Sequence, residues 1–300
     1  DRSVSRGLGD VYKRQSYNAE NIKTLLDWSS WTGKAGGFQG AIEMCNNNGS
    51  CRKLDGGVMC PSFRVTKDEK DSTRGRANSL RLALSGQLGK DALISEEMTD
   101  TMKLCVSCKA CKRECPTGVD MSKMKIELSY LQAKKYGLDI NSKLVAYLPK
   151  YAPLASKMSK IMNLRDKVPG LAKISELLLG FTAKRPLPKW RNDYFKDSEL
   201  PNTIDNIQDK TPVILFVDTF NRYHEPENVR SAIKVLNAAG YFPFIPKSKN
   251  IKRVMCCGRT YLSNGLIDNA RTEATNVLDT LLPYISEGIS VVGLEPSCIC

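Results

Sequence analysis

Four cysteines lie close together in the middle of the chain, and a proline follows the last of them. The set, Cys105, Cys108, Cys111 and Cys115 with Pro116 after it, has the pattern C-x2-C-x2-C-x3-C-P. In such a run three thiolates hold one cubane iron–sulfur cluster, and the fourth serves the other cluster in two-cluster ferredoxins. A structural zinc site would instead favour two C-x2-C pairs separated by a longer stretch. The spacing therefore predicts a [4Fe–4S] cluster.

A second cysteine group lies upstream and also ends in a Cys-Pro dipeptide. Its members are Cys45, Cys51 and Cys60, with Pro61 after the last. If the two groups form a pseudo-twofold pair, Cys60 completes the cluster held by the first three cysteines of the downstream run. The last cysteine of that run then crosses back to Cys45 and Cys51. The predicted first ligand set is Cys60, Cys105, Cys108 and Cys111, and the predicted second set is Cys45, Cys51 and Cys115.

The second set is one ligand short of a complete cubane site. Asn48 stands where a C-x2-C-x2-C pattern would have its middle cysteine. One four-iron cluster is therefore a firm expectation. The second set has several open outcomes: an ordinary four-iron cluster, a three-iron cluster, a cubane with a non-cysteine ligand, or thiols that hold no cluster.

Composition limits the remaining choices. The chain has 300 residues, 41% of them hydrophobic, so it can bury sizeable cores without disulfides, and its eleven cysteines suggest metal binding in a reducing compartment. The net charge of +13 predicts a solvated basic surface, with an acidic redox partner or an anionic membrane surface as the alternative. We expect no nucleic acid partner, because no basic motif interleaved with aromatic residues is present.

Helices are expected around the first two cysteine groups. Apolar spacing predicts helices over 72–86, 94–104 and 121–135, which would enclose a cluster site in a helical two-motif ferredoxin domain. Residues 139–210 are expected to be a connector of short apolar helices that pack on the cluster domain, ending in a Pro-rich linker. None of its apolar runs is long enough to span a bilayer.

From residue 211 the pattern changes to strands that alternate with helices. This alternation predicts a parallel sheet covered on both faces. A third cysteine group, Cys256, Cys257 and Cys298, is expected where loops leave the carboxyl ends of strands, the usual ligand crevice of such sheets. We interpret it as a metal or redox site, with buried small thiols as the alternative. The lone histidine, His224, is expected to be a loop or cap residue.

Taken together, these segments resemble a known family. The first cysteine group, the sequence Ser-Thr-Arg-Gly-Arg-Ala-Asn at 72–78 and the downstream run are similar to the iron–sulfur region of FAD-linked D-2-hydroxyacid dehydrogenases. Cys256-Cys257-Gly258 and Gly-Leu-Glu-Pro-Ser-Cys at 293–298 resemble the cysteine-rich (CCG) domain that follows it there. That domain also occurs in the iron–sulfur subunit of glycolate oxidase and in heterodisulfide reductase.

The resemblance implies a fragment with five parts. Residues 1–15 read as the translation of a sequencing adapter and are excluded from fold reasoning. Residues 16–44 would be the end of a flavin and substrate-capping region that lies outside this chain, and the CCG domain would be only its first half. The expected fold is thus α plus α/β, with the iron–sulfur domain at 45–138, the connector at 139–210 and the half-domain at 211–300.

The function implied is electron transfer. In that family FAD in the flavin domain takes a hydride from a D-2-hydroxyacid, and iron–sulfur clusters pass single electrons to a quinone or another electron carrier. The alternatives are a separate iron–sulfur subunit of a glycolate oxidase or glycerol-3-phosphate dehydrogenase complex, and a non-catalytic metal-stabilised scaffold. The expected location is the cytoplasm, with peripheral association at the inner membrane as a further alternative. No catalytic residue is assigned within this chain.

Overall fold

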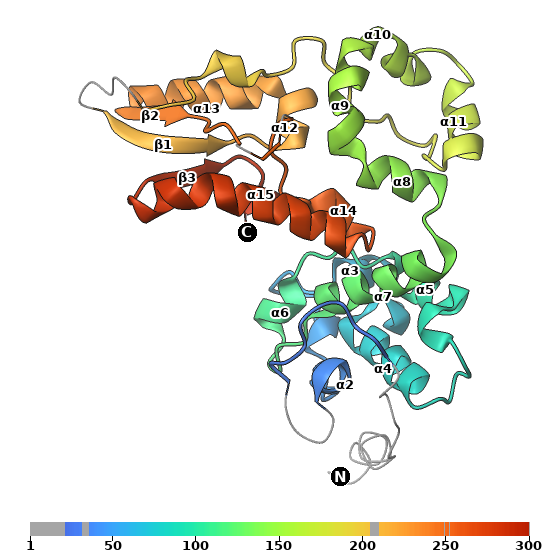
Figure 1. Ribbon diagram of the computed structural model, residues 1–300. Coiled ribbons are helices and arrows are strands. Elements are labelled where there is room, and N and C mark those ends of the chain that lie inside the picture. Colours follow the sequence, from blue (N-terminus) through green and yellow to red (C-terminus); the bar gives the residue numbers. More distant parts are fainter. Residues whose placement is uncertain (1–21, 32–35, 205–209, 249, 252, 300) are drawn as a thin grey trace. The chain divides into compact units, whose positions relative to one another are not determined.

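The computed structural model describes residues 22–31, 36–204, 210–248, 250–251 and 253–299 (Figure 1). The proposed adapter tail, residues 16–21 and Cys300 lie outside the described residues. The chain divides into two compact units, Asp1–Gly137 and Leu138–Cys300. Most regular structure is helical, and one small parallel sheet lies in the second unit.

All regular secondary structure in the described part of the first unit is helical. Its elements are α2 (Gly37–Glu43), η1 (Ser50–Arg52), α3 (Pro61–Thr66), η2 (Glu69–Asp71), α4 (Thr73–Leu84), η3 (Ala92–Ile94), α5 (Glu96–Lys103), α6 (Ala110–Glu114) and α7 (Met121–Tyr136). Side chains of Ser72, Ser95 and Asp120 cap α4, α5 and α7 by accepting hydrogen bonds from backbone N–H groups of the first turn. The three helices expected from apolar spacing are therefore confirmed; α4 and α5 are slightly shorter than expected, and α7 is one residue longer.

One hydrophobic core holds this unit together and includes most of its cysteines. Ile42, Leu80, Met124 and Leu128 are almost completely buried, and the same cluster contains four buried cysteines, Cys45, Cys51, Cys60 and Cys111. Burial of apolar surface on this scale is the main favourable term in folding. The core therefore positions the predicted ligands directly.

The segment before α2 packs on α7. The buried carboxylate of Glu127 accepts hydrogen bonds from Trp28 Nε1 and from the backbone N–H groups of Leu25 and Leu26, at 2.7–3.0 Å. Trp28 also meets Phe38 edge-on, with ring centroids 5.0 Å apart. Residues 22–31, which we assigned to the end of a preceding domain, thus share the core of the cysteine-containing unit.

The second unit combines short helices with the sheet. Its elements are α8 (Ile140–Ala146), α9 (Leu148–Lys157), α10 (Ser159–Met162), η4 (Asn163–Asp166), α11 (Leu171–Leu179), η5 (Asp197–Glu199), β1 (Thr211–Phe216), α12 (Thr219–Tyr223), α13 (Pro226–Ala238), β2 (Tyr241–Phe244), α14 (Arg259–Ser263), α15 (Ile267–Ser286), β3 (Ser290–Gly293) and α16 (Pro296–Ile299). The expected strand–helix alternation is confirmed. No described helix is both long and apolar enough to cross a membrane.

The sheet has the order β2-β1-β3, and both pairings are parallel. Ile214 of β1 pairs with Phe244 on one side and Val291 on the other. Helix α13 leads from the central strand β1 to β2 at one edge of the sheet. Helix α15 then leads from β2 to β3 at the opposite edge. Right-handed crossovers in opposite directions place the two helices on opposite faces, as Figure 1 shows for α13 and α15. The carboxyl ends of all three strands therefore lie at the same edge of the sheet.

The connector helices pack within the second unit. Helix α8 contacts α14, and α9 contacts α12. Thr260 Oγ1 donates to the carbonyl of Ala146 at 3.0 Å, and Tyr147 packs edge-on against Tyr261. Their expected packing on the cluster domain stays a prediction.

Candidate iron–sulfur sites

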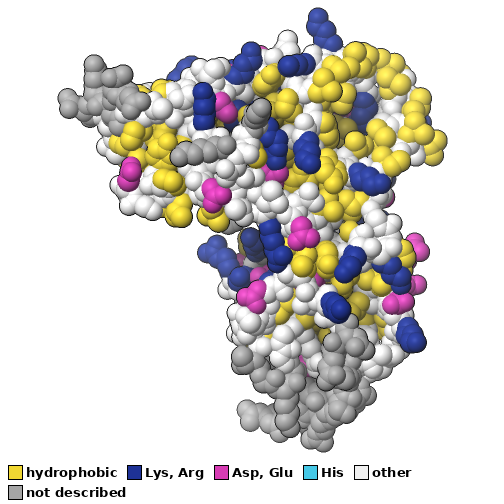
Figure 2. Space-filling view, in the orientation of Figure 1, with side chains coloured by type: hydrophobic (Ala, Val, Ile, Leu, Met, Phe, Trp, Pro, Cys, Tyr) yellow, Lys and Arg dark blue, Asp and Glu magenta, His cyan; other side chains and the backbone are white. Residues whose placement is uncertain are grey.

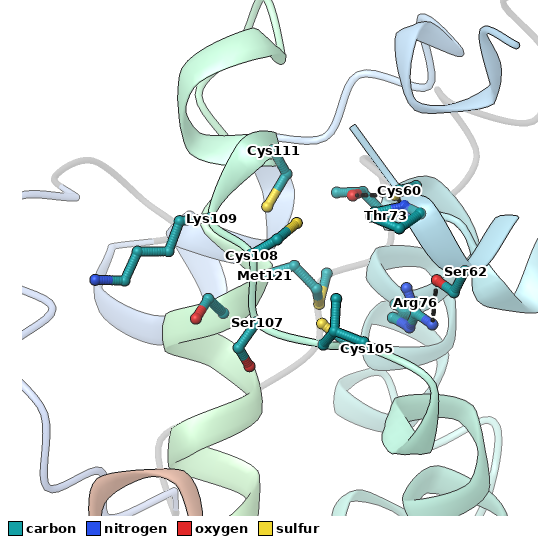
Figure 3. A pocket seen from close by; sticks show the side chains of 13 residues that line it. Cys60, Ser62, Thr73, Arg76, Cys105, Ser107, Cys108, Lys109, Cys111 and Met121 are labelled. Atoms are coloured by element: carbon teal, nitrogen blue, oxygen red, sulfur yellow. Dashed lines mark hydrogen bonds between the residues drawn. The ribbon is translucent and has the colours of Figure 1, made fainter. Parts of the chain in front are cut away.

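The first predicted ligand set lines one cavity. The cavity has a volume of about 320 Å³, and its walls include all four thiol residues, Cys60, Cys105, Cys108 and Cys111. Figure 3 shows Cys105 and Cys108 on the loop that leads from α5 into α6 and Cys111 in the first turn of α6, with Cys60 across from them at the start of α3. Segments about 45 residues apart in sequence thus bring their thiols to one space.

Unusual backbone conformations turn these thiols inward. Cys60, Ser107 and Lys109 have φ between 53° and 59°. This is the left-handed backbone region, which residues other than glycine, asparagine and aspartate seldom adopt. Two of the three flank Cys108, so the loop curls around it on both sides. Backbone strain of this kind is often found at functional sites, and here it lies at the cavity lined by the four cysteines.

Backbone and hydroxyl groups contact two of these sulfurs. Thr73 N–H donates to Cys60 Sγ at 3.0 Å, and Thr73 Oγ1 lies 2.9 Å from the same sulfur. The Met121 N–H donates to Cys111, although burial is the larger effect and raises the pKa of that thiol to about 11. Ligation requires thiolates, and donors aimed at the sulfurs stabilise that form. The donor set therefore fits a metal-bound thiolate cluster.

The second predicted set lies beside the first. A hydrogen bond between the thiols of Cys51 and Cys60 lowers the pKa of Cys51 to about 6 and raises the pKa of Cys60. Burial raises the pKa of Cys45, which is close enough to both Cys51 and Cys115 for their charges to affect it. The three cysteines of this set are thus neighbours, and one of them touches a predicted ligand of the first set.

Cys115 has a different electrostatic environment. Burial alone would raise its pKa, but hydrogen bonds from the Thr117 side chain and from three backbone N–H groups at 117–119 outweigh burial and lower it. The Thr117 hydroxyl lies 3.3 Å from the sulfur. This cluster of donors after the Cys-Pro dipeptide stabilises the thiolate that ligation needs.

Asn48 is exposed and engaged within its own loop. Its amide nitrogen donates to Asn46 Oδ1 at 2.5 Å, and its Oδ1 accepts from the Ser50 N–H at 2.9 Å. Asn47 instead lies near the thiol of Cys45, with 4.0 Å between Oδ1 and Sγ. Asn47, rather than Asn48 at the position of the missing cysteine, is therefore the residue of this loop beside the Cys45 thiol.

The third cysteine group also lines one cavity. Cys256, Cys257 and Cys298, together with Asp218 and Thr219 after β1, border a space of about 250 Å³. This is the edge at which β1 and β3 end, so the expected crevice holds the expected thiols. A hydrogen bond between the thiols of Cys256 and Cys257 raises the pKa of Cys256. The bond with Cys256 lowers the pKa of Cys257, but the bond with Cys298 and burial prevail and raise it to about 11.

Gly258 is required for this arrangement. Its φ is +79°, and a Cβ at this position would approach the carbonyl oxygen of Ala270 to 2.9 Å. Its N–H donates to Cys256 Sγ at 3.4 Å. The glycine after the paired cysteines therefore allows the backbone to turn closely against α15.

Within the described parts of the chain, no group of three or more His, Cys, Asp or Glu side chains has the geometry to hold a single metal ion.

Two cations beside the first cavity were not predicted as site residues. Arg76 lines the cavity, is buried, and forms an ion pair with the equally buried Asp71 at 3.5 Å. Lys125 of α7 donates through Nζ to the carbonyl oxygen of Cys105 at 2.5 Å. Arg76 lies in the Ser-Thr-Arg-Gly-Arg-Ala-Asn segment that carries the family resemblance, which was its only sequence signal. Lys125 had none, because a lysine in an amphipathic helix is typical of a solvated face.

His224 serves as a cap, as expected. It ends α12, its Nδ1 is 3.0 Å from the carbonyl oxygen of Lys189, and its ring lies 4.5 Å from that of Trp190. Burial lowers its pKa.

Comparisons with known proteins agree with this geometry. A family described as "4Fe-4S dicluster domain" matches residues 41–119. The chain is 25% identical to a D-2-hydroxyglutarate dehydrogenase of Escherichia coli K12, over 87% of this chain and 29% of that protein. It is 25% identical to the Pantoea ananatis enzyme of the same name, over 97% and 31%. It is also 26% identical to one of the subunits of the E. coli K12 anaerobic glycerol-3-phosphate dehydrogenase, over 49% of this chain and 35% of that protein.

Residues 41–119 therefore match a four-iron cluster domain, and the chain is similar to D-2-hydroxyglutarate dehydrogenases, which confirms the resemblance seen in the sequence. It spans about a third of the length of the curated relatives that it matches. No solved structure matches it significantly.

Proposed function

We propose that this chain is the iron–sulfur electron-transfer module of an FAD-dependent D-2-hydroxyacid dehydrogenase, with D-2-hydroxyglutarate as the substrate of the whole protein. The observation that carries the proposal is the convergence of four cysteines on one cavity inside the segment that matches the dicluster family. The relatives' names supply the substrate and the reaction class.

In this proposal the chain's own residues hold and shield the redox groups. Cys60, Cys105, Cys108 and Cys111 hold one four-iron cluster, and Cys45, Cys51 and Cys115 hold a second centre. A bound cluster accepts and releases one electron at a time, which divides the two electrons that a flavin receives with a hydride. The N–H and hydroxyl donors around Cys60, Cys111 and Cys115 stabilise the thiolates. The hydrophobic core buries Cys60 and Cys111, whereas Cys108 is exposed.

The finer architecture is part of the same proposal. We assign residues 45–138 to a helical two-motif ferredoxin domain, 139–210 to a connector, and 211–300 to the first half of a CCG domain. Cys256, Cys257 and Cys298 then form a metal or redox site at the edge of the sheet. FAD lies in a flavin domain outside this sequence, and a quinone or another electron carrier accepts the electrons.

A separate iron–sulfur subunit is the second candidate. The match to the anaerobic glycerol-3-phosphate dehydrogenase protein supports it, because that relative is named as one subunit of an enzyme. The two candidates assign the same chemistry to this chain and differ in whether the flavin domain is covalently joined to it. Determining whether the reading frame upstream of Tyr17 continues into a flavin domain separates them.

Site-directed variants test the ligand assignment. The chain is purified anaerobically as wild type, Cys108→Ala, Cys51→Ala and Cys257→Ala, and EPR spectra are recorded before and after reduction with dithionite. Cys108→Ala should abolish the signal of one reducible cubane, and Cys51→Ala should abolish a different signal. Cys257→Ala is the control and should leave both signals intact. A wild-type protein that holds zinc and no iron would contradict the proposal.

A further inference from the structure

Exposed apolar side chains gather on one part of the second unit. Ten of the exposed large hydrophobic residues lie between positions 154 and 179, on α9, α10, η4 and α11. Leu177 is 86% exposed, Leu178 64% and Leu154 61%. Figure 2 shows these elements covered with hydrophobic side chains at the upper right of the view. Contiguous exposed apolar surface of this kind marks an interaction site, and we call residues 154–184 the α9–α11 surface.

This region is also strongly cationic. Residues 140–190 contain ten Lys and Arg but only two acidic residues, Asp166 and Glu176. Lys173, Lys184 and Leu177 line an open hollow beside α11, together with one acidic side chain, Glu176. Neither lysine belongs to an ion pair recorded for the described side chains. Positive charge therefore stands beside the most exposed leucine.

The combination of leucine and lysine favours lipid over protein as the occupant. Protein–protein interfaces are enriched in aromatic side chains and arginine, and they are depleted in lysine. Helices that lie in the membrane interface instead carry Leu on one side and many Lys or Arg on the other. Lysines near an anionic membrane are attracted to it electrostatically.

We propose that the α9–α11 surface binds the face of an anionic phospholipid membrane. Leu177, Leu178 and their apolar neighbours enter the boundary between headgroups and acyl chains, and Lys173 and Lys184 contact lipid phosphates. This binding goes beyond the proposed electron transfer and does not depend on it, because no redox group takes part.

Sedimentation with vesicles tests the proposal on the cluster-loaded chain. The chain should sediment with vesicles of phosphatidylcholine and phosphatidylglycerol at low salt, less so as NaCl is added, and not with phosphatidylcholine alone. The double variant Leu177→Asp/Leu178→Asp should weaken binding by at least about tenfold, because two leucines no longer leave water. Lys173→Glu/Lys184→Glu should weaken it as well and should reduce its dependence on salt.

A matched control lies on α15. Leu278 and Leu282 are 59% and 56% exposed in the same unit, so Leu278→Asp/Leu282→Asp should bind vesicles like the wild type. The inference is overturned if the chain ignores anionic vesicles or if the α15 variant loses binding equally. Self-association that Leu177→Asp/Leu178→Asp abolishes, without vesicle binding, would assign the surface to a protein contact and also overturn it. EPR of the same samples reports the cluster independently, so failure of the proposed function would be seen separately.

Discussion

At the scale of single residues, the site depends on charge as much as on ligands. The proposed cluster would place negative charge beside the buried thiols of Cys60 and Cys111, and buried negative charge is costly without compensation. Arg76 lines this cavity and is partly neutralised by Asp71, Lys109 lines it from an exposed position, and Lys125 bonds to the carbonyl oxygen of Cys105. Lys125, on the carbonyl of Cys105, is therefore placed to tune the potential of the cluster proposed there.

Removing the charge of Lys125 should make the cluster harder to reduce. Lys125→Met takes away a cation that favours the more negative reduced state, so the midpoint potential in an EPR-monitored redox titration should fall. Lys125→Arg should keep it close to wild type. Lys134→Met is the control, since Lys134 is exposed on the same helix. Equal potentials in wild type and Lys125→Met, at unchanged iron content, would refute the tuning role.

His224 links stability of the second unit to pH. Burial lowers its pKa in the folded state, so folding favours the neutral ring. Its contribution is fully present above the unfolded value of about 6.5 and is lost as pH falls from there through the lowered folded pKa. Urea unfolding at neutral and mildly acidic pH should show less acid destabilisation in His224→Gln than in wild type. An identical pH dependence in both proteins would argue against this account.

At the scale of elements, close contacts fix the helices that carry the ligands. Gly75 in the first turn of α4 lies against η2, and a Cβ there would approach the carbonyl oxygen of Glu69 to 2.0 Å. The same turn supplies the Thr73 N–H that contacts Cys60. The glycine therefore sets both the packing of α4 and the distance of its backbone from a predicted ligand.

Substituting Gly75 should damage folding and cluster binding together. In Gly75→Ala the backbone of α4 or η2 must move, which should lower the free energy of unfolding by about 2 kcal/mol or more and reduce iron content. Ser79→Ala on the same helix should change stability by no more than about 0.5 kcal/mol. Denaturant unfolding and iron analysis measure both effects. A Gly75→Ala protein with wild-type stability would show that the contact is easily relieved.

The elements were largely predictable from sequence, and their partners were not. Apolar periodicity and capping residues such as Ser72 and Asp120 are local, and α4, α7 and the strands appear close to where those patterns placed them. The cysteine sets also came from local spacing. The packing of α8 on α14, the buried Glu127 that ties down Trp28, and Lys125 at Cys105 depend on long-range contacts, which no local pattern encodes.

At the scale of the whole molecule, two units divide the work. The first unit buries its cysteines in the same core as Ile42 and Leu80, so a metal cluster there becomes part of the folding energy of that unit. The second unit has a separate core around its sheet, to which Ile214, Leu215 and Phe244 belong. Loss of the cluster should therefore affect the two units unequally.

Tryptophan fluorescence can follow this difference. The chain has three tryptophans, Trp28 and Trp31 in the first unit and Trp190 in the second. In Trp190→Phe, the unfolding transition seen by fluorescence should shift to lower temperature when iron is removed under anaerobic conditions, because only the folded state binds the cluster. In Trp28→Phe/Trp31→Phe, the transition seen by Trp190 should shift less. Equal shifts in the two variants would contradict separate stabilisation.

The most direct test of the central claim is the quantity of iron and sulfide bound by the wild-type chain, with EPR before and after dithionite. The account predicts at least about four irons with matching sulfide, and about seven or eight if both ligand sets are filled, with a cubane signal that appears on reduction. A chain that binds zinc alone, or iron that dithionite cannot reduce, would contradict an electron-transfer role.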